Sequence, residues 1–376
     1  QTNAVKHWKP KETVVLPDDF SELMNSSNSL KTSETLSFLK EDKTKKPEKI
    51  FDESNWDLND EKGSIPPLKF SNGKTQTDIV NEILELIKKG TKTIFLHGTC
   101  GTGKSAVALN VARKLGKSSI IVPVKALQRQ YEDDYTTKKF LYKKNGEKMK
   151  IAVMTGRENH DSIINQGVSC ADQELPENIK ISEKNYPKIA DYFHNNPFVS
   201  GREVPDYKNI RRLSIAPANP YWSPIVPSTY ELNQLKDAKK IKYQGCDNRE
   251  YTFYHRKSGC SYYDQYLAYK HADVIIFNAA KYKAELSLGR KPATEIEIID
   301  EADEFLDGLF QQEEINLTRL GNSFSTIIPE SADAKETVRE IQELIRLEEQ
   351  NKRALGIDEN QVFTLEETKI KKLLEL

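Results

Sequence analysis

The sequence TIFLHGTCGTGKSAVALNVARKL, at residues 93–115, decides the fold. Residues 93–97 are mostly apolar and predict a short strand. The glycines of residues 98–103 predict a tight loop, and the spacing of the apolar residues that follow predicts a helix ending near Leu115. The loop fits the pattern Gly-x4-Gly-Lys-[Ser/Thr] without a mismatch, and it lies between a predicted strand and a predicted helix. This is the context that a phosphate-binding loop requires.

The loop predicts a site for ATP and Mg²⁺. Backbone N–H groups would surround the phosphates, and the start of the helix adds positive potential. Lys104 would neutralise charge on the β- and γ-phosphates, and the Ser105 hydroxyl would ligate Mg²⁺. The alternative is a glycine-rich turn that matches by accident. The residues expected to bind the nucleotide are Gly98, Thr99, Cys100, Gly101, Thr102, Gly103, Lys104 and Ser105.

Four further apolar runs extend the α/β pattern, at residues 119–123, 151–154, 273–277 and 295–299. Continuous runs rich in β-branched residues are typical of a parallel sheet with helices on both faces. The fold class predicted is therefore α/β.

An acidic pair, Asp300 and Glu301, follows the last of these runs directly. The carboxyl end of a strand lies at the crevice where α/β sheets bind ligands. Asp300 would hold Mg²⁺, and Glu301 would polarise the water that attacks the γ-phosphate. A solvated acidic turn is the alternative. Lys104, Asp300 and Glu301 are thus the candidate catalytic residues.

The phosphate-binding loop, followed by Asp-Glu-Ala-Asp, resembles superfamily 2 helicases, and other stretches resemble the XPD and DinG helicases. Gln76 resembles the adenine-recognising glutamine upstream of the loop. Residues 122–131 resemble the segment that touches the DNA backbone. Residues 156–160 and 259–263 resemble the two ends of the iron–sulfur insertion, and residues 273–282 resemble the strand and loop before the acidic motif.

The resemblance covers residues 66–310 in the family's order. It implies a RecA-like motor domain and an ATP-dependent DNA helicase, which tracks along single-stranded DNA from 5′ to 3′ and unwinds forked DNA in repair. The resemblance also implies that the motor is a monomer. It implies a location in the cytoplasm, at the nucleoid or, in a eukaryote, in the nucleus. The residues expected to contact DNA are Lys125, Gln128, Arg129 and Arg157.

The same resemblance predicts the domain organisation. A polar extension (1–64) precedes the motor domain (65–156 and 271–312), which a cysteine-containing insertion (157–270) interrupts. Residues 313–376 would begin a helical, arch-like subdomain, with helices expected over residues 334–354 and 363–376. The family's second motor domain is expected beyond this chain, so the chain alone should hydrolyse ATP poorly.

Cys170, Cys246 and Cys260 are candidate ligands of the [4Fe–4S] cluster that the resemblance implies. Such clusters normally use four thiolates, and here Asp161 stands near where the family has its first cluster cysteine. A cluster with another fourth ligand, a degenerate cluster and no cluster all stay open. Ordinary buried thiols are the simplest alternative, and zinc ranks lower because paired ligands are missing.

The overall charge is balanced, with 56 Lys and Arg against 57 Asp and Glu, so any surface for a polyanion must be local. Residues 116–150 carry nine basic and four acidic side chains. This local surplus of positive charge fits a surface that follows the phosphates of a nucleic-acid backbone. A solvated hairpin tip around Asn145 and Gly146 is the alternative for part of this stretch. Four scattered cysteines indicate a reducing, intracellular compartment, and no apolar run is long enough to cross a bilayer.

A second class of function also fits the sequence. A non-motor P-loop protein could use ATP as a switch, with the insertion serving protein contacts. A weaker third possibility is a nuclease-associated lobe or a pseudo-enzyme. Stimulation of ATP hydrolysis by single-stranded DNA would separate the motor from the switch.

Overall fold

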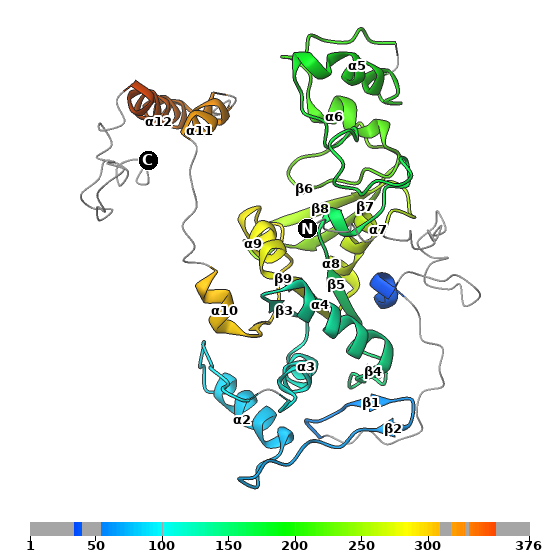
Figure 1. Ribbon diagram of the computed structural model, residues 1–376, viewed down its shortest axis with the longest axis vertical. Helices are drawn as coiled ribbons and strands as arrows, with labels where there is room; N and C mark the ends of the chain where they lie inside the picture. Colours follow the sequence, from blue (N-terminus) through cyan, green and yellow to red (C-terminus); the bar gives the residue numbers. More distant parts are fainter. Residues whose placement is uncertain are drawn as a thin grey trace, which may run out of the picture. The chain divides into compact units, whose positions relative to one another are not determined.

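Four parallel strands form the sheet at the centre of the larger of two structural units (Figure 1). The computed structural model describes residues 34–39, 54–99, 101–199, 201–308, 317–325, 327 and 331–350. The two units are Gln1–Leu306 and Asp307–Leu376. The strand order is β10 (Ile296–Ile299), β3 (Ser118–Val122), β9 (Val274–Asn278) and β5 (Ile151–Met154), and every neighbouring pair is parallel.

Helices cover both faces of this sheet because its side chains alternate between two cores. Ile120 and Val122 pack with the first set of helices, and Ile121 packs on the opposite face. The first set is α2 (Gln76–Lys88), α3 (Lys104–Leu115) and α4 (Lys125–Glu132). The second set is α7 (Ser261–Asp264), η6 (Gln265–Leu267), α8 (Ala268–His271), α9 (Ala279–Ser287) and α10 (Ala302–Asp307). The predicted α/β architecture is therefore confirmed.

The strand expected at residues 93–97 is the one error in the predicted sheet. These residues have no regular secondary structure, and 81% of the surface of Phe95 is exposed. A strand exists only where a neighbour completes its hydrogen-bond ladder. Here the segment lines a pocket together with β10 instead of pairing with it, and in the described part of the chain β10 pairs only with β3.

Between β5 and β9, the chain forms a second, antiparallel sheet. β8 (Glu250–His255) lies between β6 (Ile225–Pro227) and β7 (Lys239–Gln244). A small separate core joins α5 (Tyr186–His194) to α6 (Arg212–Ile215). Besides η6, the described part of this region has the 3₁₀ turns η3 (Arg157–Asn159), η4 (Glu183–Asn185) and η5 (Ala216–Ala218).

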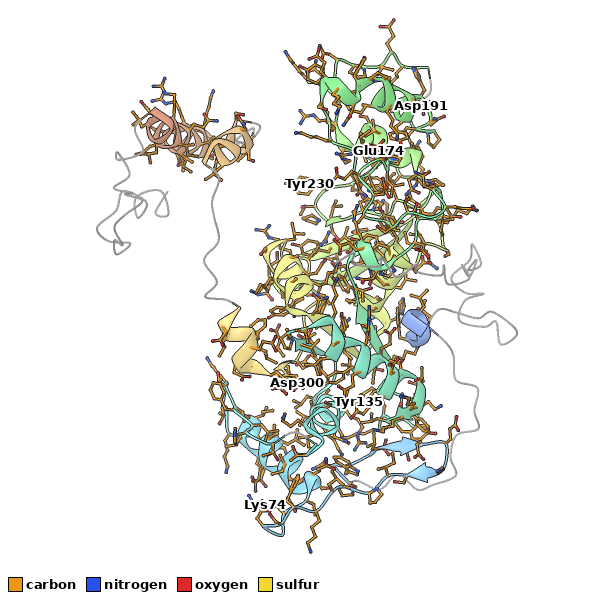
Figure 2. All side chains as sticks on the ribbon, in the orientation of Figure 1. Lys74, Tyr135, Glu174, Asp191, Tyr230 and Asp300 are labelled. Atoms are coloured by element: carbon orange, nitrogen blue, oxygen red, sulfur yellow. The ribbon has the colours of Figure 1, made fainter. Side chains whose placement is uncertain are left out.

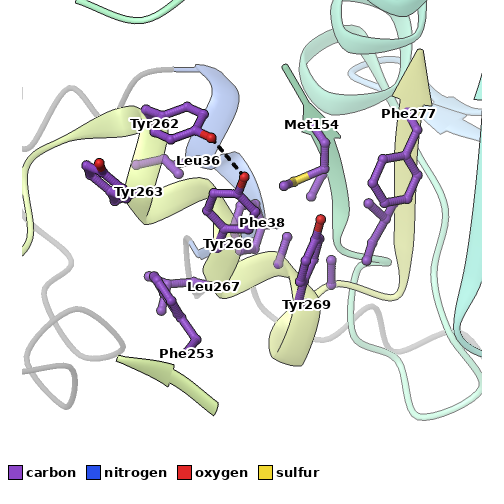
Figure 3. Close-up of a cluster of buried hydrophobic side chains, with 14 of the residues drawn as sticks. Leu36, Phe38, Met154, Phe253, Tyr262, Tyr263, Tyr266, Leu267, Tyr269 and Phe277 are labelled. Atoms are coloured by element: carbon purple, nitrogen blue, oxygen red, sulfur yellow. Dashed lines mark hydrogen bonds between the residues drawn. The ribbon is translucent and has the colours of Figure 1, made fainter. Parts of the chain in front are cut away.

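An aromatic cluster joins this insertion to the central sheet. The Tyr262 and Tyr266 hydroxyl oxygens are 3.0 Å apart. The Tyr266 and Tyr269 rings meet edge to face at 5.3 Å, and Tyr269 in turn packs against Phe277 of β9. Figure 3 shows these rings between the short helices and the strands. Such pairs contribute about 0.5–1.5 kcal/mol beyond their buried area, so the insertion is firmly attached to the central sheet.

A short N-terminal segment is part of the same cluster. η1 (Glu34–Leu39) buries the side chains of Leu36, Phe38 and Leu39. Figure 3 shows Leu36 and Phe38 in the cluster. The polar composition of residues 1–64 gave no sign of this packing. Farther along, Trp56 and Leu58 enter the core on the other face of the sheet.

A small antiparallel sheet lies beside these N-terminal residues. Its strands, in the order β2-β1-β4, are β2 (Gly63–Ser64), β1 (Asn59–Asp60) and β4 (Lys139–Phe140). β4 follows η2 (Asp133–Lys138), a π-helical turn that continues α4.

The smaller unit contains α11 (Leu317–Phe324) and α12 (Ala332–Gln350). Ile341 and Ile345 of α12 are buried, and a Cβ added at Gly321 of α11 would lie 3.1 Å from Ile345, so the two helices are closely packed. α12 agrees with the helix predicted at residues 334–354, whereas the helix predicted at residues 363–376 lies outside the described residues. None of the described helices combines the length and the apolar character needed to cross a membrane.

Candidate nucleotide site

The phosphate-binding loop leads directly into α3, which begins at Lys104. Gly101 and Gly103 have φ values of 82° and 71°, in the left-handed region that favours glycine. No side chain caps the start of α3, so the positive end of the helix is not neutralised by a residue of its own cap. This is the arrangement that favours a bound anion.

The Gln76 side chain hydrogen-bonds with the backbone of the phosphate-binding loop. Gln76 is the first residue of α2, whose start is fixed by a capping box between Thr75 and Asp78. The Gln76 side chain is 2% exposed; its amide accepts a hydrogen bond from the Leu68 N–H at 2.8 Å and donates to the Thr102 carbonyl at 2.9 Å. Gln76 therefore lies at the nucleotide loop as predicted, while both ends of its amide are engaged within the protein. Its recognition of adenine stays a prediction.

Lys104 lies between the loop and the acidic pair. Its ammonium donates to the Gly98 carbonyl at 3.0 Å and lies 3.8 Å from a carboxylate oxygen of Glu301. Lys104, Asp300 and Glu301 also line one pocket of about 910 Å³, which extends between α3 and β10. Two segments that are about two hundred residues apart in the sequence thus meet at one site.

Glu301 has an unusual backbone. Its φ of 51° places a non-glycine residue in the left-handed region, which costs about 1–2 kcal/mol. Strain of this kind is concentrated at functional sites. The turn lies between β10 and α10, where it directs Glu301 towards the lysine of the loop.

Asp300, labelled in Figure 2, continues the β10 ladder, since its N–H donates to the Ile121 carbonyl at 2.9 Å. One of its carboxylate oxygens accepts a hydrogen bond from the Tyr131 hydroxyl at 2.8 Å. That phenol is 2% exposed. Burial, and then the Asp300 carboxylate, raise the pKa of Tyr131 well above its usual value. In the sequence, Tyr131 is the last residue of the stretch 122–131 that resembles the DNA-contacting segment, and nothing there links it to the acidic pair.

Ser105 and Asp300 fit a magnesium ion. Both offer oxygen atoms, which this hard cation prefers. Mg²⁺ in nucleotide sites keeps several waters and takes only one or two protein ligands, with substrate phosphates completing its shell. The described residues contain no group of three or more His, Cys, Asp or Glu side chains that could hold a metal ion.

The three insertion cysteines do not come together. Cys170 and Cys260 are buried with their sulfur atoms 3.7 Å apart. Cys246 lies elsewhere, in the turn after β7, and its thiol donates to the Gly289 carbonyl. The Cys260 contact, and then burial, raise the pKa of the Cys170 thiol, which disfavours the thiolate that a metal requires. The predicted iron–sulfur ligand set is therefore corrected to one cysteine pair and one separate thiol, and these residues do not fit a cluster.

The four residues expected to contact DNA divide into two kinds. Lys125 and Arg129 are exposed on α4, and the Lys125 ammonium is 3.8 Å from Glu158 across the surface. Gln128 is buried; its amide donates to the Met154 carbonyl at 2.7 Å and accepts from Asn278 at 3.2 Å. It joins α4 to the ends of β5 and β9, a structural role that leaves its amide turned away from solvent.

Arg157 is likewise engaged inside the insertion. Its guanidinium hydrogen-bonds with Asn178 and lies 5.0 Å from the centre of the Tyr262 ring. The basic stretch 116–150 ends in a hairpin turn, as the alternative interpretation predicted, because Tyr142 and Lys148 form an antiparallel bridge. Of the predicted contacts, Lys125 and Arg129 are therefore exposed, Arg157 is half-buried and Gln128 is buried.

Comparison with known proteins gives one family. Residues 69–204 match the family described as Type III restriction enzyme, res subunit. No match was found among the curated proteins or among the solved structures. The matched range contains the phosphate-binding loop, α4 and the first part of the insertion. It supports a superfamily 2 helicase-like ATPase domain, consistent with the RecA-like arrangement of sheet and helices.

Proposed function

We propose that this chain provides the ATP-binding lobe of a superfamily 2 DNA helicase of the XPD and DinG type, which couples ATP hydrolysis to movement along single-stranded DNA. The observation that carries the proposal is the meeting of Lys104 with the acidic pair in one pocket, at a Lys104–Glu301 distance of 3.8 Å. The family match over residues 69–204 supports the helicase-like part of this proposal.

Each residue of the site has a distinct role. The loop N–H groups and the start of α3 would bind the phosphates, and Lys104 would exchange its present contact with the Gly98 carbonyl for the phosphate oxygens. Ser105 and Asp300 would hold Mg²⁺, which supplies charge neutralisation at the phosphates when bound. Glu301 would accept a hydrogen bond from the attacking water and orient it in line with the bond that breaks. Hydrolysis then yields ADP and phosphate.

α4 is the part of this lobe that we propose faces the DNA backbone. Lys125 and Arg129 are one helical turn apart, so both charges lie on one side of α4. Gln128, between them in sequence, fixes the helix to β5 and β9. Basic side chains on a rigidly attached helix can bind phosphates without reading bases.

A second function remains in competition, that of an ATP-dependent switch without motor activity. The burial of Gln128 and the internal contacts of Arg157 favour it, because two of four expected DNA contacts serve the fold instead. Steady-state ATP hydrolysis, measured with and without single-stranded oligonucleotide, separates the two. Hydrolysis that rises with DNA supports the motor, and hydrolysis indifferent to DNA supports the switch.

Substitution of Lys104 tests the nucleotide site itself. Charged hydrogen bonds contribute about 1.5–3 kcal/mol, so Lys104→Ala should weaken ATP binding about 10- to 150-fold. Lys114→Ala, near the far end of α3, removes a similar charge from the same helix and should leave binding unchanged. Equal affinity of the Lys104 variant and the unaltered protein would exclude the phosphate role.

A further inference from the structure

Tyr131 is a buried polar group that the proposed hydrolysis does not explain. A tyrosine in a helix that faces a sheet is ordinarily a core residue, with its hydroxyl directed to water or to a backbone carbonyl. Here the hydroxyl donates to the Asp300 carboxylate at 2.8 Å. The phenol thus contacts one of the two side chains that we propose as the magnesium ligands.

The position of Tyr131 is set by the helix that carries it. Tyr131 follows Gln128 by three residues, so both lie on the face of α4 turned towards the sheet. Gln128 holds that face through the carbonyls of Met154 and Ile276, at 2.7 and 3.2 Å. The phenol therefore cannot move independently of α4. A shift of the helix would be transmitted to the Asp300 carboxylate.

We propose that Tyr131 is a positioning residue, which orients Asp300 for the magnesium–nucleotide complex and links it mechanically to α4. This inference rests on the proposed function, since it assigns Tyr131 to the same ATP site. The phenol keeps its proton and acts through the carboxylate that it touches. It forms no bond to the nucleotide itself. Outer partners of this kind commonly change metal affinity about 10- to 100-fold when they are removed.

The chain offers a matched control in Tyr135. It lies one turn farther along, its ring is 5.8 Å from that of Tyr131, and it is also largely buried. Tyr135 makes no hydrogen bond with Asp300 or Ser105 among the contacts of the described residues. Removing its hydroxyl changes the same core by the same atom without touching the proposed magnesium ligands.

The test is ATP binding by the whole chain as a function of Mg²⁺ concentration, measured by calorimetry. Tyr131→Phe should raise the Mg²⁺ concentration at half-maximal enhancement of ATP binding by about tenfold or more, and leave ATP binding in EDTA unchanged. Tyr135→Phe should behave as the unaltered protein. An unchanged Mg²⁺ midpoint in Tyr131→Phe would overturn this inference alone, whereas absence of ATP binding by the unaltered protein would overturn the proposed function as well.

A second variant separates positioning from general loosening of the fold. In an Asp300→Asn background, Tyr131→Phe should produce no further shift of the Mg²⁺ midpoint, because its effect runs through the carboxylate. A shift as large as in the unaltered background would show that the phenol acts by another route and would overturn the proposal.

Discussion

Replacement of Gly103 by alanine tests how tightly the nucleotide loop is built. An ideal Cβ at this position would lie 2.3 Å from the Gln76 side-chain nitrogen, and the φ of 71° is unfavourable for alanine. The backbone contributes about 1–2 kcal/mol of strain. Displacing the Gln76 amide, which is buried and bonded to Thr102, adds about 1 kcal/mol. The free energy of unfolding in urea should fall by about 2–3 kcal/mol, the sum of these two effects.

Gly101→Ala is the matched control for this prediction. Gly101 has a similar φ of 82°, but nothing lies within 4 Å of an added Cβ. It should therefore show only the backbone cost, and the difference between the two variants reports the contact with Gln76. In the double variant Gln76→Ala/Gly103→Ala, the clash between the added Cβ and the Gln76 side chain is absent. The part of the loss in unfolding free energy that this clash causes should therefore disappear. Equal losses for the two alanine substitutions would refute the reasoning that Gln76 and Gly103 fit only as a pair.

Two further predictions concern the insertion and its anchor. Phe38→Ala should lower the free energy of unfolding by about 3–5 kcal/mol, as expected for a buried phenylalanine, because its side chain is 2% exposed in the aromatic cluster. Urea unfolding measures this loss, with Leu68→Ala at an exposed site as the control. Equal small losses in the two variants would contradict the prediction. Burial, helped by Lys281, lowers the pKa of His160 to about 3, whereas the unfolded histidine titrates near 6.5. Its contribution to stability is therefore complete above about pH 6.5 and is lost as the pH falls towards 3. His160→Gln should flatten the dependence of unfolding free energy on pH between 6.5 and 5 by up to about 1.4 kcal/mol per pH unit. A slope identical to that of the unaltered protein would contradict the assignment; a residual slope is expected from His271, whose pKa burial lowers to about 4.

Much of the nucleotide site followed from the sequence because its parts are local. The loop pattern fixes glycines, lysine and serine within eight residues, and the start of α3 follows from the loop. The carboxyl ends of parallel strands meet at one edge of a sheet, which predicts that Asp300 approaches the loop. The pocket shared by Lys104, Asp300 and Glu301 agrees with this expectation.

Other features depend on partners that are distant in the sequence. Tyr131 meets Asp300 across 169 residues, and a tyrosine on an inward helix face is indistinguishable from a core residue until its partner is known. The available indication was its three-residue spacing from Gln128. Residues 93–97 have the composition of a strand, but composition does not show whether β10 pairs with them.

The cysteines and the N-terminal segment illustrate the same limit. Spacing along the chain could not show that Cys170 faces Cys260 while Cys246 lies in the turn after β7. Leu36, Phe38 and Leu39 are surrounded by polar residues in the sequence, and their burial arises from the aromatic rings supplied by residues beyond 250.

The most direct test of the central claim is a comparison of ATP binding and ATP hydrolysis for Glu301→Gln. Glutamine keeps the shape of the side chain but cannot act as the carboxylate that orients the attacking water. We predict that this variant, assayed with single-stranded DNA, binds ATP with the affinity of the unaltered protein and loses turnover about 100-fold or more, in line with the effect of a general base. Undiminished turnover would show that the loop lysine and the acidic pair do not act on the same triphosphate.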